Sequence, residues 1–241
     1  MTRLGVNIDH VATVRNARGS LHPSPLVIAK HAMECGAHSI TIHLREDRRH
    51  INDSDVIKIC KNKKIITNLE ISLNNEILKI ALKNKPNFIC IVPEKRKEIT
   101  TEGGLNLSKN LNKIKEIITK FNKKNIRTSL FIDPNLKDIK IAKELNVDCV
   151  ELHTGKISDL VKNKRNHNYE YKKIKKCCIL ANKIGLEIHA GHGLDYKTTK
   201  ILSTLSEIKE FNIGHFIIGE SIIHGLKNTI KKFKKITNIN K

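Results

Sequence analysis

A histidine and an arginine stand two positions apart at the end of a short alternating stretch. Apolar and polar residues alternate over residues 39–44, and this period of two is typical of a β-strand. His43 and Arg45 fall on the polar side. An imidazole can transfer protons and a guanidinium can grip an anion, so this strand would carry acid–base and anion-binding groups at its carboxyl end. The alternative is a solvated edge strand that runs into the charged turn at residues 46–50.

Other predicted strands repeat this spacing of polar residues. The pairs that share one side of a strand are Asn7 and Asp9, Asn68 and Glu70, and Glu151 and His153, and His189 lies near the end of a further apolar run. If the strands are parallel, their carboxyl ends converge on one mouth, where barrel enzymes hold their active sites. For any single pair, a satisfied polar layer inside a barrel is the alternative.

Two glycine-containing segments could bind phosphate. Residues 191–193 (GHG) follow the seventh predicted strand, and residues 212–215 (NIGH) lead into the eighth. Glycines leave backbone N–H groups uncrowded, and the loops near the seventh and eighth strands of a barrel commonly bind phosphate. Residues 93–104, with a glycine pair, form either a lid above the mouth or a solvated loop.

Two kinds of chemistry have weaker support. No lysine lies inside a predicted strand, and only Lys95 and Lys156 come near the mouth, so an enzyme-bound Schiff base is disfavoured. A metal site remains an alternative, although no HxH or HExxH spacing supports it. Its oxygen and nitrogen ligands would be His43, Glu70, Glu151 and His189.

The elements that must position these groups alternate along the chain. Predicted strands cover residues 4–9, 39–44, 65–72, 88–92, 127–133, 149–154, 186–190 and 215–219. Helical patterns lie between them, and a last helix is predicted over residues 222–236. Eight such strands in 241 residues predict an α/β fold, a parallel (β/α)₈ TIM barrel forming a single domain over residues 1–241. An open doubly wound sheet is the alternative, but no GxGxxG follows the first strand.

The net charge of +21 points first to nucleic acid. Only nine of the 45 basic residues are arginine, and the lysines are scattered beside asparagine and isoleucine. No aromatic residues interleave with the charge, and no nucleic-acid-binding motif is present. We therefore expect no nucleic-acid partner and small-molecule substrates instead.

The apolar runs and the cysteines indicate whether the protein contacts a membrane and in which compartment it works. No apolar run approaches 18 residues and no signal-peptide pattern opens the chain, so we expect no membrane partner. The six cysteines contain no CxxC pair and are typical of buried thiols in a reducing cytoplasm.

Long motifs resemble one enzyme family. They are GVNIDHVATVRNARG at residues 5–19, TIHLREDRRHI at 41–51, NLE at 68–70, VPEKRKEITTEGG at 92–104, AGHGL at 190–194 and NIGH at 212–215. Together they resemble the pyridoxine 5'-phosphate synthases of vitamin B6 biosynthesis, and the resemblance covers essentially the whole chain. It implies a (β/α)₈ barrel with extra helices that assembles as an octamer and needs no metal or other cofactor. The implied reaction condenses 3-amino-2-oxopropyl phosphate with 1-deoxyxylulose 5-phosphate, and releases phosphate and water as the pyridine ring closes.

The resemblance also implies site residues at the matching positions. Acid–base groups would be His43, Glu70 and His192, with Glu151 stabilising charged intermediates. The amino-ketone phosphate would be bound by Asn7, Arg18, Gly193, Gly214 and His215. The deoxyxylulose phosphate would be bound by Asp9, His10, Arg45, His50 and Thr100. The chain departs from the family pattern at His189, where an amide is expected, and in the lysine- and asparagine-rich residues 162–176.

Overall fold

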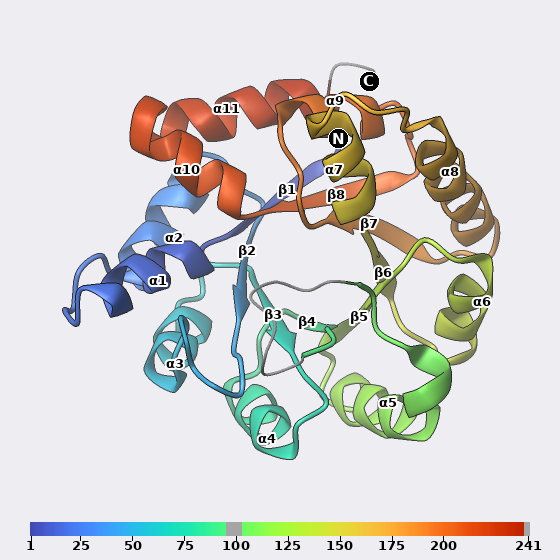
Figure 1. The fold of residues 1–241 in the computed structure, drawn as a ribbon. Coiled ribbons are helices and arrows are strands. Elements are labelled where there is room, and N and C mark those ends of the chain that lie inside the picture. Colours follow the sequence, from blue (N-terminus) through green and yellow to red (C-terminus); the bar gives the residue numbers. More distant parts are fainter. Residues whose placement is uncertain (95–102, 239–241) are drawn as a thin grey trace.

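Eight parallel strands close into a barrel in the computed structural model, which describes residues 1–94 and 103–238 (Figure 1). Each strand pairs with the next in the sequence, and the last pairs with the first. The strands are β1 (Arg3–Asn7), β2 (Ser39–His43), β3 (Thr67–Ile71), β4 (Phe88–Ile91), β5 (Arg127–Ile132), β6 (Cys149–His153), β7 (Glu187–Gly191) and β8 (Ile208–Ile213). The predicted TIM barrel is confirmed.

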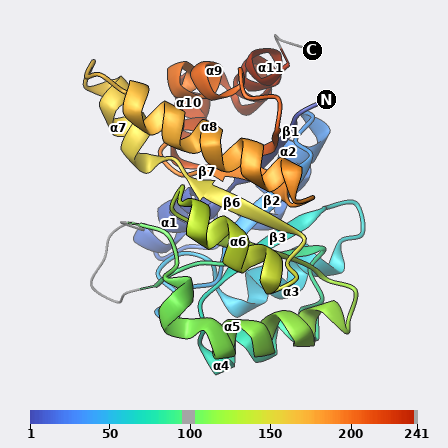
Figure 2. The same cartoon turned by 90° about the vertical axis from the view of Figure 1, so that its right-hand side faces the viewer.

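Helices surround the strands on all sides (Figures 1 and 2). They are α1 (Asp9–Ala17), α2 (Pro25–Glu34), α3 (Asp53–Lys61), α4 (Asn75–Asn84), α5 (Leu107–Asn122), α6 (Leu136–Glu144), α7 (Gly155–Lys162), α8 (Asn168–Lys183), α9 (Tyr196–Leu202), α10 (His215–His224) and α11 (Leu226–Thr237). Side-chain caps begin several of them, because the side chains of Asn74, Asn135 and Asp195 accept hydrogen bonds from first-turn amides.

The two faces of the barrel wall differ in chemistry. Outward side chains such as Leu4, Ile42 and Phe211 are fully buried against the helices, and they form the main apolar core. Inward side chains are largely polar and hydrogen-bond across the barrel: Ser39 Oγ to Glu210 Oε1 at 3.0 Å, and Thr41 Oγ1 to Asn212 Oδ1 at 3.3 Å.

Gly5 makes these contacts between β2 and β8 possible. It lies on the intervening strand β1, and a Cβ there would collide with the side chains of Asn212 and Ser39. A glycine at this position therefore lets polar side chains fill the barrel interior.

The prediction of the eighth strand was wrong. Residues 215–219 begin α10, and β8 lies earlier, over Ile208–Ile213. The run Phe216 to Ile218 is apolar and short, and periodicity alone cannot tell such a run from a buried helix. The true strand looks like a loop in the sequence because it contains Lys209, Glu210 and Asn212.

This shift changes two other predictions. Lys209 lies within β8, so the statement that no strand contains a lysine was wrong, although its side chain is exposed and donates to Ser206 O. The helix predicted over residues 222–236 is divided between α10 and α11, because Gly225 adopts φ +76°.

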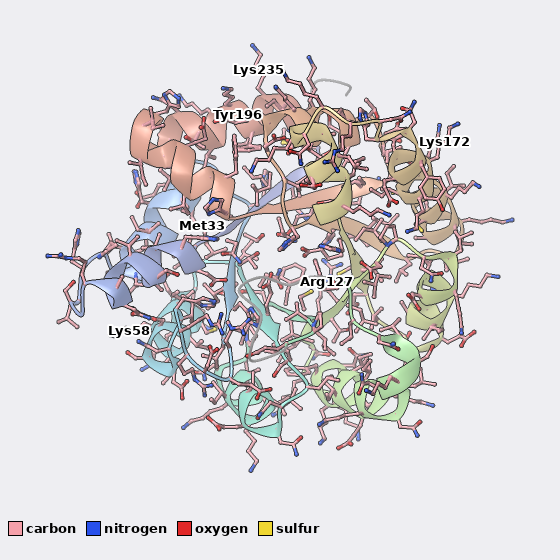
Figure 3. All side chains as sticks on the ribbon, viewed as in Figure 1. Met33, Lys58, Arg127, Lys172, Tyr196 and Lys235 are labelled. Carbon is pink, nitrogen blue, oxygen red and sulfur yellow. The ribbon has the colours of Figure 1, made fainter. Side chains whose placement is uncertain are left out.

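The lysines lie mainly on the outer helices. Figure 3 shows Lys58, Lys172 and Lys235 on three different sides of the molecule, whereas Arg127 lies near the barrel. Over residues 1–94 and 103–238, no helix combines the length and apolarity needed to cross a membrane.

Candidate active site

A cavity of about 400 Å³ opens at the carboxyl ends of the strands. This volume lies within the range of small-molecule sites. Eight of the predicted site residues line it: Asn7, His10, Glu70, Glu151, His192, Gly193, Gly214 and His215. Strands far apart in the sequence thus bring together most of the groups that the motifs single out.

Two glutamates inside the mouth are difficult to ionise. Burial raises the pKa of Glu151 to about 7, although His189 and a hydrogen bond from Asn212 oppose the shift. Burial also raises the pKa of Glu70 well above its usual value, and the charges of Glu151 and Asp9 add to the effect. Carboxyl groups with such values can donate and accept protons near neutral pH.

Glu151 is held from two sides. Asn212 Nδ2 donates to Glu151 Oε2 at 2.7 Å, which links β8 to β6. A Cβ at Gly191 would collide with the Glu151 carboxylate, so glycine is required at the end of β7. In the neighbouring strand His189 is the register partner of Glu151, and it is itself held by Glu187, whose Oε1 lies 2.9 Å from His189 Nε2.

His192 is half-buried between Gly191 and Gly193 and adopts a left-handed conformation, with φ +75°. Burial lowers the pKa of His192 to about 4, and the nearby His153 contributes, with ring centroids 5.1 Å apart. At neutral pH the His192 imidazole is therefore uncharged, and it can accept a proton or donate its remaining N–H.

His43 lies between two carboxylates at the end of β2. Its Nδ1 is 3.7 Å from Glu70 Oε2, and its Nε2 is 3.6 Å from Glu94 Oε2. Arg45 NH2 lies 3.7 Å from Glu94 Oε1, and Arg45 Nε lies 3.3 Å from Asp47 Oδ1. His43 and Arg45 are both buried, so the alternative of a solvated edge strand is excluded.

Two predicted residues, Asp9 and His50, lie beside His43. Asp9 Oδ1 accepts a hydrogen bond from the His43 amide at 2.9 Å and lies 4.0 Å from His50 Nδ1. Asp9, His43 and His50 each offer one possible metal-ligand atom, and these atoms lie within 4.8 Å of one another. The metal ligands considered from the sequence were a different set, with only His43 in common.

The imidazole of His10 faces that of His215 at the mouth, with ring centroids 5.1 Å apart. Burial lowers the pKa of His10, the charge of His215 adds to the effect, and Asp9 opposes it. Arg18 is exposed at the end of α1 and does not line this cavity. Thr100 lies outside the described residues, as does most of the predicted lid.

A second cavity of about 620 Å³ adjoins the first and shares His192, Gly193, Gly214 and His215 with it. Both glycine segments lie here, since residues 212–215 end β8 and begin α10 instead of entering a strand. The first residues of α7 and α10, Gly155 and His215, also line this cavity. Amides at helix N-termini and uncrowded glycines favour a bound anion.

Sequence reasoning missed Glu94. Its side chain is 2% exposed, and Oε1 accepts the amide hydrogen of Glu46 at 2.9 Å. Burial favours the protonated carboxyl, but His43, the Glu46 amide and Arg45 together hold the pKa of Glu94 below its usual value. A carboxylate three residues after β4 was the available signal, within a motif that had been interpreted as a lid.

The mouth therefore combines buried acid–base groups with a neighbouring anion site. A profile of the family described as pyridoxal phosphate biosynthesis protein PdxJ matches residues 4–239. The chain belongs to the PdxJ family. It is an enzyme, and PdxJ relatives match it over almost its whole length.

Two such relatives are named pyridoxine 5'-phosphate synthase. The protein of Pelagibacter ubique is 77% identical over 99% of this chain and 100% of its own length. The protein of Zymomonas mobilis is 47% identical over 96% of this chain and 90% of its own length. The family resemblance found in the motifs is confirmed.

Solved structures with little sequence similarity share the fold. The tryptophan synthase of M. tuberculosis superposes with a TM-score of 0.64, at 7% identity, over 98% of this chain and 93% of its own. At this identity the match supports the barrel alone, so the chemistry must be argued from the residues at the mouth.

Proposed function

We propose that the chain condenses 3-amino-2-oxopropyl phosphate with 1-deoxyxylulose 5-phosphate to form pyridoxine 5'-phosphate, phosphate and water. The observation that carries the proposal is that the buried Glu151 and the partly buried Glu70 line one cavity, where their raised pKa values suit proton transfer at neutral pH. They lie in one cavity with the uncharged His192, beside a second cavity suited to phosphate.

The nitrogen of the ring would come from the substrate. None of the described residues that line the main cavity is a lysine, so the amine that attacks a ketone here would be that of the amino ketone. The resulting carbinolamine loses water to give an imine, and ring closure requires further eliminations. Each of these steps moves protons between carbon, oxygen and nitrogen, which is the work of general acids and bases.

Individual residues would share this work according to their positions. His43 and Glu70 lie 3.7 Å apart and would pass protons to and from one substrate. His192, which lines the same cavity as Glu70, would act next to the phosphate held at Gly193 and Gly214. Glu151, held by Asn212, would stabilise positively charged imine intermediates in its ionised form.

The second phosphate would be held near β2. Arg45, His50 and Asp9 lie close to His43, and we assign the deoxyxylulose phosphate to this group. Arg45 is paired with Glu94 and Asp47, so an incoming phosphate would compete with these carboxylates for the guanidinium. The roles of Arg18 and Thr100 in substrate binding are proposed from the family motifs alone.

The test is direct formation of product. The purified protein, incubated with both phosphates, should generate the pyridinol chromophore, and omission of either substrate should abolish it. Identification of pyridoxine 5'-phosphate by mass would complete the assignment. Consumption of only one substrate, or no chromophore at saturating concentrations of both, would contradict the proposal.

We also propose that the chain works in the cytoplasm as a homo-oligomer, up to the octamer of its family. Its six cysteines are free thiols, which suits a reducing compartment. Ile222 and Ile223 of α10 are 82% and 73% exposed, and an interface between copies would bury them. Light scattering should give an assembly larger than one 27.4 kDa chain.

A further inference from the structure

Ser158 carries a buried hydroxyl group for which the described residues provide no hydrogen-bond partner. The residue is 6% exposed, and its Oγ is fully shielded. Most buried hydroxyl groups in proteins are hydrogen-bonded, because an unmade bond in the interior is unfavourable. Ser158 lies in α7 and lines the second cavity together with Gly193 and Gly214.

The Ser158 side chain packs directly against Gly193. A Cβ built on Gly193 would lie 3.1 Å from Ser158 Cβ and 3.3 Å from Ser158 Oγ. Gly193 itself has φ +76°, which favours glycine at this turn. The hydroxyl is thus in contact with the segment whose backbone N–H groups we expect to bind phosphate.

The start of α7 adds donors at the same place. Thr154 precedes α7, but its hydroxyl donates to the carbonyls of Gly191 and His192, each at 2.7 Å, and makes no hydrogen bond to the α7 amides. The first residue of α7, Gly155, lines the cavity. Helix N-terminal amides carry a partial positive charge and bind anions.

The acidic residues of this cavity are already engaged. Asp195 Oδ1 accepts the Thr198 amide at 2.7 Å as the cap of α9, and Asp159 Oδ1 accepts from Asn163 Nδ2 at 2.8 Å. Lys162 lines the same cavity and supplies a cation. An anion that only accepts hydrogen bonds therefore fits the inner wall formed by Ser158 and the glycines.

We propose that Ser158 Oγ donates a hydrogen bond to the phosphate group of the substrate bound at Gly193 and Gly214. The identity of that phosphate ester rests on the proposed function, whereas the anion site does not. Nothing in the family motifs singles out Ser158, which lies within α7, before the lysine-rich residues 162–176 and the AGHGL segment. The residue would therefore tune substrate affinity in this chain without taking part in proton transfer.

The test compares Ser158→Ala with Ser129→Ala. Ser129 is a suitable control because it is also a buried serine, 4% exposed, and its hydroxyl lies beside the thiols of Cys90 and Cys149. It points into the barrel from β5 and lines neither cavity. Calorimetric titration with inorganic phosphate, and separately with pyridoxine 5'-phosphate, should show about tenfold weaker binding to Ser158→Ala and unchanged binding to Ser129→Ala.

Turnover provides a second readout. We expect Ser158→Ala to raise the KM for the amino-ketone phosphate and to leave kcat nearly unchanged, with thermal unfolding like that of the wild type. Equal affinity of wild type and Ser158→Ala for phosphate, equal losses in both variants, or no phosphate binding to the wild type would overturn the inference. If phosphate binding falls only in Ser158→Ala but no protein forms product, the inference stands and the proposed reaction fails.

Discussion

Glu70 and Glu151 bring two carboxyl groups to one cavity, and the charge of Glu151 makes the ionisation of Glu70 less favourable. Burial is the largest cause of both raised pKa values, and at neutral pH Glu151 is divided between its two protonation states. His192 shows the reverse effect, because burial of an imidazole favours its uncharged form. The same physical cause thus prepares acids and bases that function at one pH.

The raised pKa of Glu151 predicts how stability changes with pH. An unfolded glutamate titrates near 4.3, whereas folded Glu151 titrates at about 7, so its contribution to stability is complete below the unfolded value and is lost as the pH rises through 7. We predict that Glu151→Gln removes this loss. The free energy of unfolding of the variant, relative to wild type, should rise by roughly 1–3 kcal/mol between pH 5 and pH 8.

His189→Asn is the complementary variant for this measurement. The positive charge of a protonated His189 lowers the pKa of Glu151, so removing it should shift the titration of Glu151 to higher pH. The groups that surround His189 are Glu151, Glu210, Glu187 and Arg3, with Arg127 paired to Glu187. If the difference in unfolding free energy between Glu151→Gln and wild type stays constant from pH 5 to pH 8, Glu151 titrates normally and the account is contradicted.

Arg45 tests the assignment of the second phosphate. Arg45→Lys keeps the charge but loses the planar fork that grips two oxygens together. We predict a KM raised about tenfold for the deoxyxylulose phosphate and little changed for the amino ketone. Steady-state kinetics with each substrate varied in turn measure this, and Glu94→Gln controls for loss of the buried pair between Arg45 and Glu94. A similar rise for both substrates, or a sharply lower Tm, would favour a structural ion pair instead.

At the scale of elements, strand periodicity located most of the barrel. Seven predicted strands overlap real ones, because their apolar faces pack against helices and alternate regularly. The eighth failed because its inward residues, Glu210 and Asn212, complete the polar interior of the barrel, which cannot be recognised before the fold is known. The apolar first turns of α10, which follow Gly214, were predicted as the eighth strand instead.

The site was predictable where a residue ends a strand and less so elsewhere. His43, Glu70 and Glu151 follow from alternation; Glu70 and Glu151 line one cavity, and His43 Nδ1 lies 3.7 Å from Glu70 Oε2. Glu94 and Ser158 were missed because one follows its strand in an irregular segment and the other lies within a helix. For Glu94 the sequence offered only a carboxylate just after β4, and the contact of Ser158 with Gly193 carries no local sequence signal.

The ends of β1 and β2 bring Asp9, His43 and His50 within reach of one cation. The amides of His43 and Ile51 already donate to Asp9 Oδ1 and His50 Nδ1, which occupies lone pairs that a metal would need. We predict full activity after exhaustive chelation, measured as product formation in metal-free buffer. Activity that is lost and returns only with one particular divalent ion would instead identify this trio as a metal centre.

At the scale of the whole molecule, the charge of +21 is spread over the outer helices (Figure 3). Charge of this kind attracts nucleic acid without selecting a sequence, and its affinity falls steeply with salt because counterions are released. We predict weak DNA binding at low salt that disappears by about 150 mM salt. Fluorescence anisotropy with two unrelated duplexes tests this, and tight binding that prefers one duplex at physiological salt would reveal a second function.

In the proposed reaction, the barrel as a whole places His43 where the two substrates would meet. His43→Asn keeps a polar group of similar size but removes acid–base capacity, which is typically worth about 10²–10⁴ in rate. The decisive measurement is turnover and thermal unfolding on the same preparation of this variant. The account predicts turnover lowered by at least roughly 10²-fold with folding and substrate binding nearly intact. Normal turnover per folded molecule, with only stability lost, would contradict it and make His43 a packing residue.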